Sequence, residues 1–169
     1  MHIAADKDKV VARIHTWMDE IQVFCDDLGL KGSIGAAAVV MMPSEGPHLQ
    51  YLLGKDMAHT VFESEVVRLL LVLQLLCRYP NARMALITLD NQAAIAALTN
   101  RPSQPGHYIV NTIYDQLCML RWSHPRMWVH VEWTPGHTKV LGNERADMLA
   151  CATAAGTHSP LNDLPRVLQ

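Results

Sequence analysis

Residues 133–147 read Trp-Thr-Pro-Gly-His-Thr-Lys-Val-Leu-Gly-Asn-Glu-Arg-Ala-Asp, and this stretch decides the fold. Its Pro135-Gly136 pair predicts a rigid turn that holds His137 over a site. Asn143 is a good cap for a helix that follows the turn. Asp147 then lies one turn into that helix and faces back toward the sheet on which the helix packs. The spacing therefore predicts a histidine and a carboxylate at defined positions around one turn.

Three earlier carboxylates stand where strands end or a helix begins. Asp26 follows an apolar strand expected over residues 21–25, and Asp90 follows a strand expected over 82–88. Glu65 lies in the first turns of a long apolar helix, where a carboxylate is costly unless it is paired or binds a metal. Each residue alone is compatible with a simple cap. Together they predict acidic side chains gathered at one sheet edge, where a hard divalent cation relieves their repulsion.

The order of elements predicts one mixed sheet with helices packed on its faces. Thr60 and Glu63 form a capping-box pattern at the start of the long apolar helix. We expect an N-terminal helix within residues 1–20, the main domain over 21–155 and a loosely ordered tail over 156–169. Within the main domain the pattern predicts strands at 21–25, 33–42, 49–53, 82–88 and 127–133, and helices at 60–77, 91–98, from the Pro105-Gly106 break to about residue 122, and 143–155.

Composition places the chain among single-domain globular proteins. It has 169 residues, of which 50% are hydrophobic and 18% charged. It lacks a secretory signal or a membrane-spanning run, so we expect a soluble intracellular protein, cytoplasmic or nuclear, with no membrane partner. A formal net charge of −2 excludes a polycation that grips nucleic acid by charge alone. The four cysteines have no zinc-site spacing and are expected to be buried free thiols: Cys25, Cys77, Cys118 and Cys151.

Four separated motifs occur in an order that resembles one family. They are Val-Phe-Cys-Asp26, Thr-Val-Phe-Glu-Ser-Glu65, Ile-Thr-Leu-Asp90-Asn-Gln-Ala-Ala, and the block from Trp133 to Asp147. Over roughly residues 20–155 the chain resembles the ribonuclease H domains of reverse transcriptases, particularly those of fungal-type retrotransposon polyproteins. The resemblance implies a ribonuclease H-like α/β fold with a five-stranded mixed sheet and helices on both faces.

The resemblance also implies a set of site residues. Its four metal-binding carboxylates correspond to Asp26, Glu65, Asp90 and Asp147. His137 matches the histidine of a flexible loop that assists proton movement or product release, with packing on the Pro135 turn as the alternative. Glu63 competes with Glu65 for the second carboxylate, but the family pattern favours Glu65 and leaves Glu63 as a cap. Substrate contacts are expected from Asp27, Asn91 and Gln92, although Asn91 and Gln92 are equally suited to cap the helix that follows.

The implied activity is hydrolysis of the RNA strand of an RNA–DNA hybrid. Two Mg²⁺ ions, which Mn²⁺ can replace, would support an endonuclease reaction that leaves 5′-phosphate and 3′-hydroxyl ends. The expected partners are the hybrid and the polymerase domain of the same polyprotein, to which residues 1–20 would connect. Tethering to that domain would offset the weak hybrid affinity that a net charge of −2 predicts.

One departure from the family keeps a second function open. Most members carry Gly-Ser after the first aspartate, whereas this chain has Asp27-Leu28. A side chain there could obstruct the substrate or add negative charge beside it. The alternative is therefore a catalytically silent module of the same fold that binds or acts as a scaffold. DNA strand transfer, as in integrases and transposases, is a third possibility, and the block from Trp133 to Asp147 speaks against it.

Overall fold

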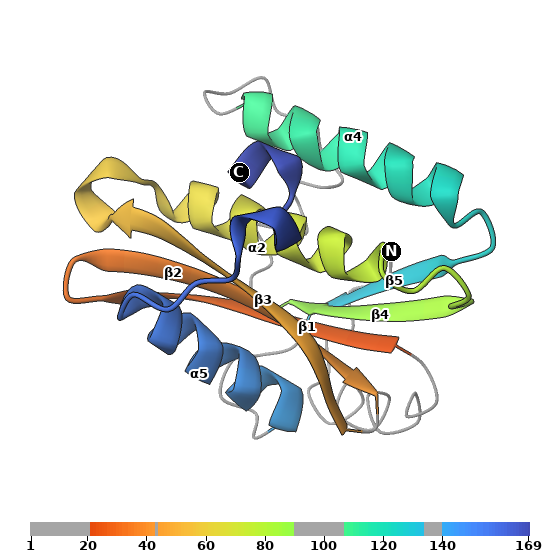
Figure 1. Ribbon diagram of the computed structural model, residues 1–169, viewed down its shortest axis with the longest axis horizontal. Coiled ribbons are helices and arrows are strands. Elements are labelled where there is room, and N and C mark those ends of the chain that lie inside the picture. The colour runs from red at the N-terminus through yellow and green to blue at the C-terminus, as the bar shows by residue number, and fades with distance from the viewer. Residues whose placement is uncertain (1–20, 43, 90–106, 134–139) are drawn as a thin grey trace.

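The computed structural model describes residues 21–42, 44–89, 107–133 and 140–169. It contains a five-stranded mixed sheet in the order β3-β2-β1-β4-β5 (Figure 1). The described elements are β1 (Ile21–Leu30), β2 (Ser33–Met42), β3 (Ser44–Lys55), η1 (Asp56–Ala58), α2 (Val61–Leu76), β4 (Met84–Leu89), α4 (His107–Ser123), β5 (Trp128–Trp133), α5 (Leu141–Ala154), η2 (Leu161–Asp163) and η3 (Arg166–Leu168). The helix expected within residues 1–20 and the one expected at 91–98 lie outside the described residues.

Strand β1 is the centre of the sheet and is longer than the sequence predicts. It pairs antiparallel with β2 up to Leu30, so Asp26 and Asp27 lie inside the strand, opposite Ala37 and Ala36. Its parallel pairing with β4 is shorter and ends where Phe24 meets Thr88. The predicted end at residue 25 is therefore wrong for the strand as a whole, because the hairpin with β2 satisfies the backbone beyond the apolar run.

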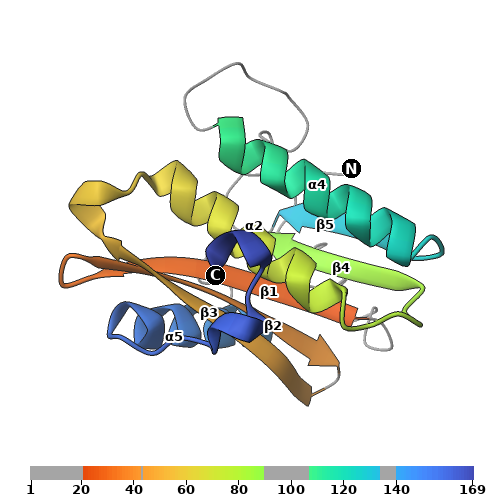
Figure 2. The ribbon, with the colours of Figure 1, turned by 45° about the horizontal axis from the view of Figure 1, so that its top comes forward.

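Helices cover both faces of the sheet, as the fold class predicts. Helices α2 and α4 lie on one face and α5 on the other (Figures 1 and 2). Side chains of the central strands alternate between the two faces: Val23 and Cys25 point into the cluster under α2, whereas Phe24 points into the cluster under α5. Burial on both faces explains why β2 reads as an unbroken apolar run.

Helix α2 is the most enclosed helix among the described residues. Its predicted capping box is confirmed: the Thr60 hydroxyl accepts a hydrogen bond from the Glu63 amide, and the Glu63 carboxylate accepts one from the Thr60 amide. From Ser64 to Leu76 its residues are buried except Gln74. No helix within the described ranges is long and apolar enough to cross a membrane.

The start of α5 differs from the prediction. The helix begins at Leu141 with Val140 at the N-cap, and no side chain caps it, so Asn143 is a helical residue rather than the cap. Val140 is buried in the same cluster as Ala146 and Leu149. Apolar packing at Val140 therefore sets the entry to the helix in place of a capping hydrogen bond.

The C-terminal segment is packed against the sheet, and the expectation of a loosely ordered tail is wrong. Ser159 makes two hydrogen bonds with Gln50 on the edge strand β3: its amide donates to the Gln50 carbonyl, and its hydroxyl accepts from the Gln50 amide. The chain then crosses to the face covered by α2, where Leu164 is 1% exposed within the core (Figure 2). This segment covers the open edge of β3 and fills the gap beside α2.

The four cysteines are free, but most of them are not buried. Cys25 lies in the core, Cys151 is partly exposed, and Cys77 and Cys118 are exposed. The expectation of buried thiols is therefore confirmed for Cys25 alone. Cys77, Cys118 and Cys151 lie within a helix or directly after one. One face of such a helix packs on the core and the other faces solvent, and local apolarity does not show which face a cysteine takes.

Gly35 allows α5 to approach β2 closely, and this contact is testable. A Cβ at Gly35 would meet the Ala150 carbonyl oxygen at 2.6 Å and would also meet the Ala154 amide. We expect Gly35→Ala to lower the free energy of unfolding by roughly 1–3 kcal/mol, because backbone atoms cannot yield as side chains do. Gly29→Ala, with nothing near the added methyl group, is the matched control and should change it by at most about 0.5 kcal/mol. Urea denaturation measures both variants, and an equal change in the free energy of unfolding for Gly35→Ala and Gly29→Ala would contradict the close contact at Gly35.

The packed tail generates a second prediction. Leu164→Ala should lower the free energy of unfolding by about 2–5 kcal/mol, because it leaves a cavity in the core. Leu161→Ala, in the same segment but at a side chain that is 55% exposed, should change it by about 0.5 kcal/mol or less. Thermal or urea unfolding of both variants measures the difference, and a silent Leu164→Ala would mean that the tail does not dock.

Candidate functional site

The candidate site lies where the parallel strands β1 and β4 end their pairing. The last register pair is Phe24 with Thr88, two residues before Asp26 in one strand and two residues before Asp90 along the other segment. Strands β1 and β4 are parallel neighbours, so the chain leaves both strands at the same edge of the sheet. Asp90 itself lies outside the described residues, as do Asn91, Gln92 and His137, and their roles stay predictions.

Asp26 and Asp27 point to opposite faces of the sheet. Asp26 continues the alternation of Gln22 and Phe24 toward α5, whereas Asp27 continues that of Cys25 toward α2. The Asp27 amide donates a hydrogen bond of 2.8 Å to the Asp26 carboxylate, which orients that carboxylate. The Asp27 carboxylate instead accepts a hydrogen bond of 2.6 Å from the Ser64 hydroxyl on α2. The structure therefore gives Asp27 partners inside the protein, and its predicted contact with a substrate is untested.

The first turns of α2 bring Glu65 to the same place. Glu65 is buried beside Ser64, and its carboxylate forms an ion pair with the Arg68 guanidinium one turn further along the helix. The expectation that a carboxylate on this apolar helix is paired or binds a metal is thus met by a pair. Glu65 and Asp27, 38 residues apart in the sequence, both lie next to the Arg68 guanidinium where α2 packs on β1.

Arg68 is the central residue of this cluster, and sequence analysis missed it. Its side chain is only 1% exposed, and its Nη1 atom lies 3.4 Å from an Asp27 oxygen and 3.9 Å from an Asp26 oxygen. With Glu65 on Nη2, one guanidinium faces three carboxylates. The signal was available: Arg68 is the one basic residue between Thr60 and Cys77, three positions after Glu65 on an apolar helix.

Helix α5 packs on the face of the sheet opposite to α2, and it places Asp147 near Asp26. A Cβ at Gly142 would meet the Phe24 ring, and Gly35, the partner of Leu28 in β1, touches Ala150 and Ala154. The stretch of α5 between these two contacts, residues 146–147, therefore passes the position of Asp26, which lies between Phe24 and Leu28. Asp147 is partly exposed there and makes no hydrogen bond or ion pair within the described part of the chain.

The donors of this cluster fit a hard divalent cation. Carboxylate oxygens are the ligands that Mg²⁺ and Mn²⁺ prefer. Asp26 and Glu65 converge closely enough for one cationic group, the Arg68 guanidinium, to reach both, which shows that positive charge is accommodated between them. Among the described residues, however, no three acidic, histidine or cysteine side chains are arranged as a ready metal site.

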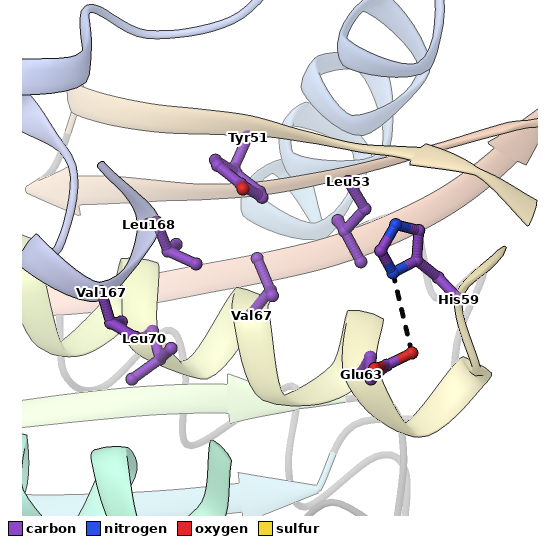
Figure 3. A pocket seen from close by; sticks show the side chains of 8 residues that line it. All are labelled: Tyr51, Leu53, His59, Glu63, Val67, Leu70, Val167 and Leu168. Atoms are coloured by element: carbon purple, nitrogen blue, oxygen red, sulfur yellow. Dashed lines mark ion pairs between the residues drawn. The ribbon is translucent and has the colours of Figure 1, made fainter. Parts of the chain in front are cut away.

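The side chains of Glu63 and Glu65 point to different faces of α2. Glu63 faces a largely apolar cavity of about 190 Å³ between α2, β3 and the C-terminal segment, and its carboxylate lies 3.7 Å from the His59 ring (Figure 3). Glu65 faces the Arg68 cluster instead. Residues two positions apart on a helix point to different faces, which explains this difference. The capping box confirms Glu63 as the capping residue.

The basic and aromatic residues between α4 and β5 are a second polar region. Trp122 is 91% exposed and Trp128 is 70% exposed, with the exposed Arg121 and Arg126 nearby in sequence. His124 does not belong to this surface, because it is buried and its ring pairs with the Ser123 hydroxyl at 2.7 Å. Two cationic and two indole side chains are therefore exposed in this region.

The two glutamates of α2 can be separated experimentally. Glu63→Ala should lower the free energy of unfolding by roughly 0.5–2 kcal/mol, because it removes half of the capping box. It should leave the rise in melting temperature on adding Mn²⁺ unchanged. Glu65→Gln should abolish that rise, because Glu65 supplies a predicted metal oxygen. Thermal unfolding with and without Mn²⁺ measures both effects. Loss of the Mn²⁺-dependent rise in Glu63→Ala, with the rise kept in Glu65→Gln, would make Glu63 the metal ligand instead.

Comparison with known proteins shows the fold. No protein-family model matches the chain, and no curated protein sequence matches it. Among solved structures, the chain is similar to the N-terminal ribonuclease H domain of a Mycobacterium tuberculosis protein, solved as a fusion with maltose-binding protein. The two share 19% identity with a TM-score of 0.59, over 80% of this chain and 98% of the other.

Two further structures extend the comparison. A ribonuclease H1 named LC11, solved in complex with an RNA/DNA hybrid, is 12% identical with a TM-score of 0.60, over 80% of this chain and 97% of the other. The protease–reverse transcriptase of prototype foamy virus is 15% identical with a TM-score of 0.55, and the match covers 82% of this chain but 21% of that larger chain. At these identities the likeness is one of architecture, and the chain has the ribonuclease H fold.

Proposed function

We propose that this chain is a ribonuclease H, an endonuclease that hydrolyses the RNA strand of RNA–DNA hybrids. The observation that carries the proposal is the convergence of Asp26 on β1 and Glu65 on α2 around one cation, in a fold shared with ribonucleases H. Each carboxylate comes from a separate sequence motif. Both carboxylates reach the Arg68 guanidinium near the end of the β1–β4 pairing, which supports a shared metal site there.

Four carboxylates would hold the metal in this proposal: Asp26, Glu65, Asp90 and Asp147. When bound, two Mg²⁺ ions, or Mn²⁺ in their place, supply an activated water and stabilisation of the leaving 3′ oxygen. The Asp27 amide keeps the Asp26 carboxylate oriented, and the walls of α2 and β1 keep Glu65 out of bulk water. His137 would assist proton movement or product release.

The proposed substrate is recognised by its RNA strand. A protein distinguishes RNA from DNA through the 2′-hydroxyl, which both donates and accepts hydrogen bonds. Polar groups next to the metal carboxylates, namely Asn91, Gln92 and Asp27, are the proposed contacts. The LC11 ribonuclease H1 was solved with such a hybrid, which supports the same substrate class here. Cleavage would leave a 5′-phosphate and a 3′-hydroxyl.

We further propose that the domain works beside a polymerase domain of the same polyprotein, as in retrotransposons of the fungal type. The likeness to part of a foamy virus protease–reverse transcriptase supports this setting. A net charge of −2 supports it too, because a weakly attracted hybrid is best held by a tethered partner. Residues 1–20 would form the connection, and the proposed location is inside the cell.

A cleavage assay tests the activity directly. Purified protein is incubated with an end-labelled RNA–DNA hybrid, double-stranded RNA or double-stranded DNA, each with Mg²⁺, Mn²⁺ or chelator. We expect metal-dependent cutting of the RNA strand of the hybrid alone. Asp26→Asn and Asp90→Asn should each reduce the rate at least about 100-fold, because metal stabilisation of the transition state is worth several kcal/mol. Sequencing or phosphatase treatment of the products checks the proposed ends.

A catalytically silent module of the same fold is the second candidate, and Arg68 is the observation that favours it. A guanidinium already neutralises carboxylates that a metal would need. No cutting in Mn²⁺ at low salt, even with the polymerase domain added in trans, would favour the silent module. Cutting that appears only with that domain would favour a nuclease that depends on its partner.

A further inference from the structure

We propose that Arg68 is an internal cation that competes with divalent metal for the carboxylates of the site and thereby sets the metal concentration at which the site fills. The inference rests on the proposed function in one respect: Asp26 and Glu65 are taken to be metal ligands. It goes beyond that function because it assigns a regulatory role to a residue outside the four carboxylates.

The geometry places the Arg68 guanidinium on the ligand oxygens themselves. Its Nη2 atom pairs with Glu65, and its Nη1 atom lies 3.9 Å from Asp26. Arg68 is 1% exposed and Glu65 is 8% exposed, so salt screens this pair much less than a surface pair, whereas Asp26 is 25% exposed. A metal ion that binds the same carboxylate oxygens must displace at least part of the guanidinium. The positive charge of Arg68 also repels the metal ion.

Asp27 provides the place to which the guanidinium can withdraw. It lies 3.4 Å from Nη1, closer than Asp26, and its other oxygen is held by the Ser64 hydroxyl at 2.6 Å. Asp27 points toward α2, on the face opposite to Asp26, so it can keep Arg68 when a metal takes the other carboxylates. The acidic residue at position 27 and the basic residue at position 68 thus form a matched pair.

The charges of the cluster favour an exchange between two cations. Three carboxylates face one guanidinium, so these four side chains carry a formal net charge of −2 when the carboxylates are ionised. Buried negative charge in a low dielectric attracts any cation within reach. Arg68 therefore holds the site together in the absence of metal and raises the concentration of metal needed to fill it.

The test measures Mn²⁺ binding without nucleic acid, by calorimetry and by the rise in melting temperature. Arg68→Met removes the charge but keeps an unbranched side chain. We expect it to bind Mn²⁺ about 10- to 100-fold more tightly than the unaltered protein, the range given by a hydrogen bond to a charged group. It should also melt at a lower temperature without metal, because buried carboxylates lose their partner.

Arg78→Met is the matched control for net charge. Arg78 lies just beyond the end of α2 and pairs with Asp163 at 3.6 Å, far along the helix from the cluster. It should leave Mn²⁺ affinity unchanged. If Arg68→Met does not fold, the double variant Asp27→Asn/Arg68→Met is compared with the single variant Asp27→Asn. The double variant removes one charge of each sign. It should bind Mn²⁺ more tightly than Asp27→Asn does.

The outcomes separate this inference from the proposed function. Equal Mn²⁺ affinity with and without Arg68 overturns the competition and leaves the nuclease proposal standing. Tighter binding in Arg68→Met, but no cleavage of the hybrid by any variant, supports the competition and counts against the nuclease. Absence of Mn²⁺ binding in every variant overturns both.

Discussion

The arrangement of this protein depends on one strand that is hydrogen-bonded along both sides and covered on both faces. Strand β1 pairs with β2 from Gln22 to Leu30 and with β4 from Ile21 to Phe24. Its alternation sends Asp26 toward α5 and Asp27 toward α2. Two adjacent acidic residues in this partly buried part of the strand need polar partners. Asp26 accepts a hydrogen bond from the Asp27 amide, and both carboxylates lie near the Arg68 guanidinium.

Charge compensation then decides what surrounds the strand. Helix α2 supplies the Ser64 hydroxyl, the Glu65 carboxylate and the Arg68 guanidinium within its first two turns. Among the described residues, Arg68 is the cation that balances the acidic cluster in the absence of metal. A divalent ion and an arginine answer the same electrostatic need, so a site of this kind can change its metal demand through one residue of the helix.

The second face shows how small residues position a carboxylate. Helix α5 crosses β1 and β2 at short range because Gly142 and Gly35 leave room for the Phe24 ring and for the backbone of the helix. The edge strand β3 is closed by the C-terminal segment through Ser159 and Gln50. The packing of α5 and of the C-terminal segment on the sheet therefore rests on contacts between residues that are more than 100 positions apart in the chain.

The sequence by itself determined the fold class, the five strands and the capping box of Thr60 and Glu63, because these follow from local periodicity and local hydrogen bonding. It did not reveal the length of β1, the start of α5 at Leu141, the docked C-terminal segment or the exposed cysteines. Only the tertiary structure decided that Arg68 turns into the acidic cluster and that Asp27 pairs with α2. The physical reason is that these features depend on which distant group supplies a hydrogen bond, an opposite charge or an apolar surface, and a single sequence does not record that pairing.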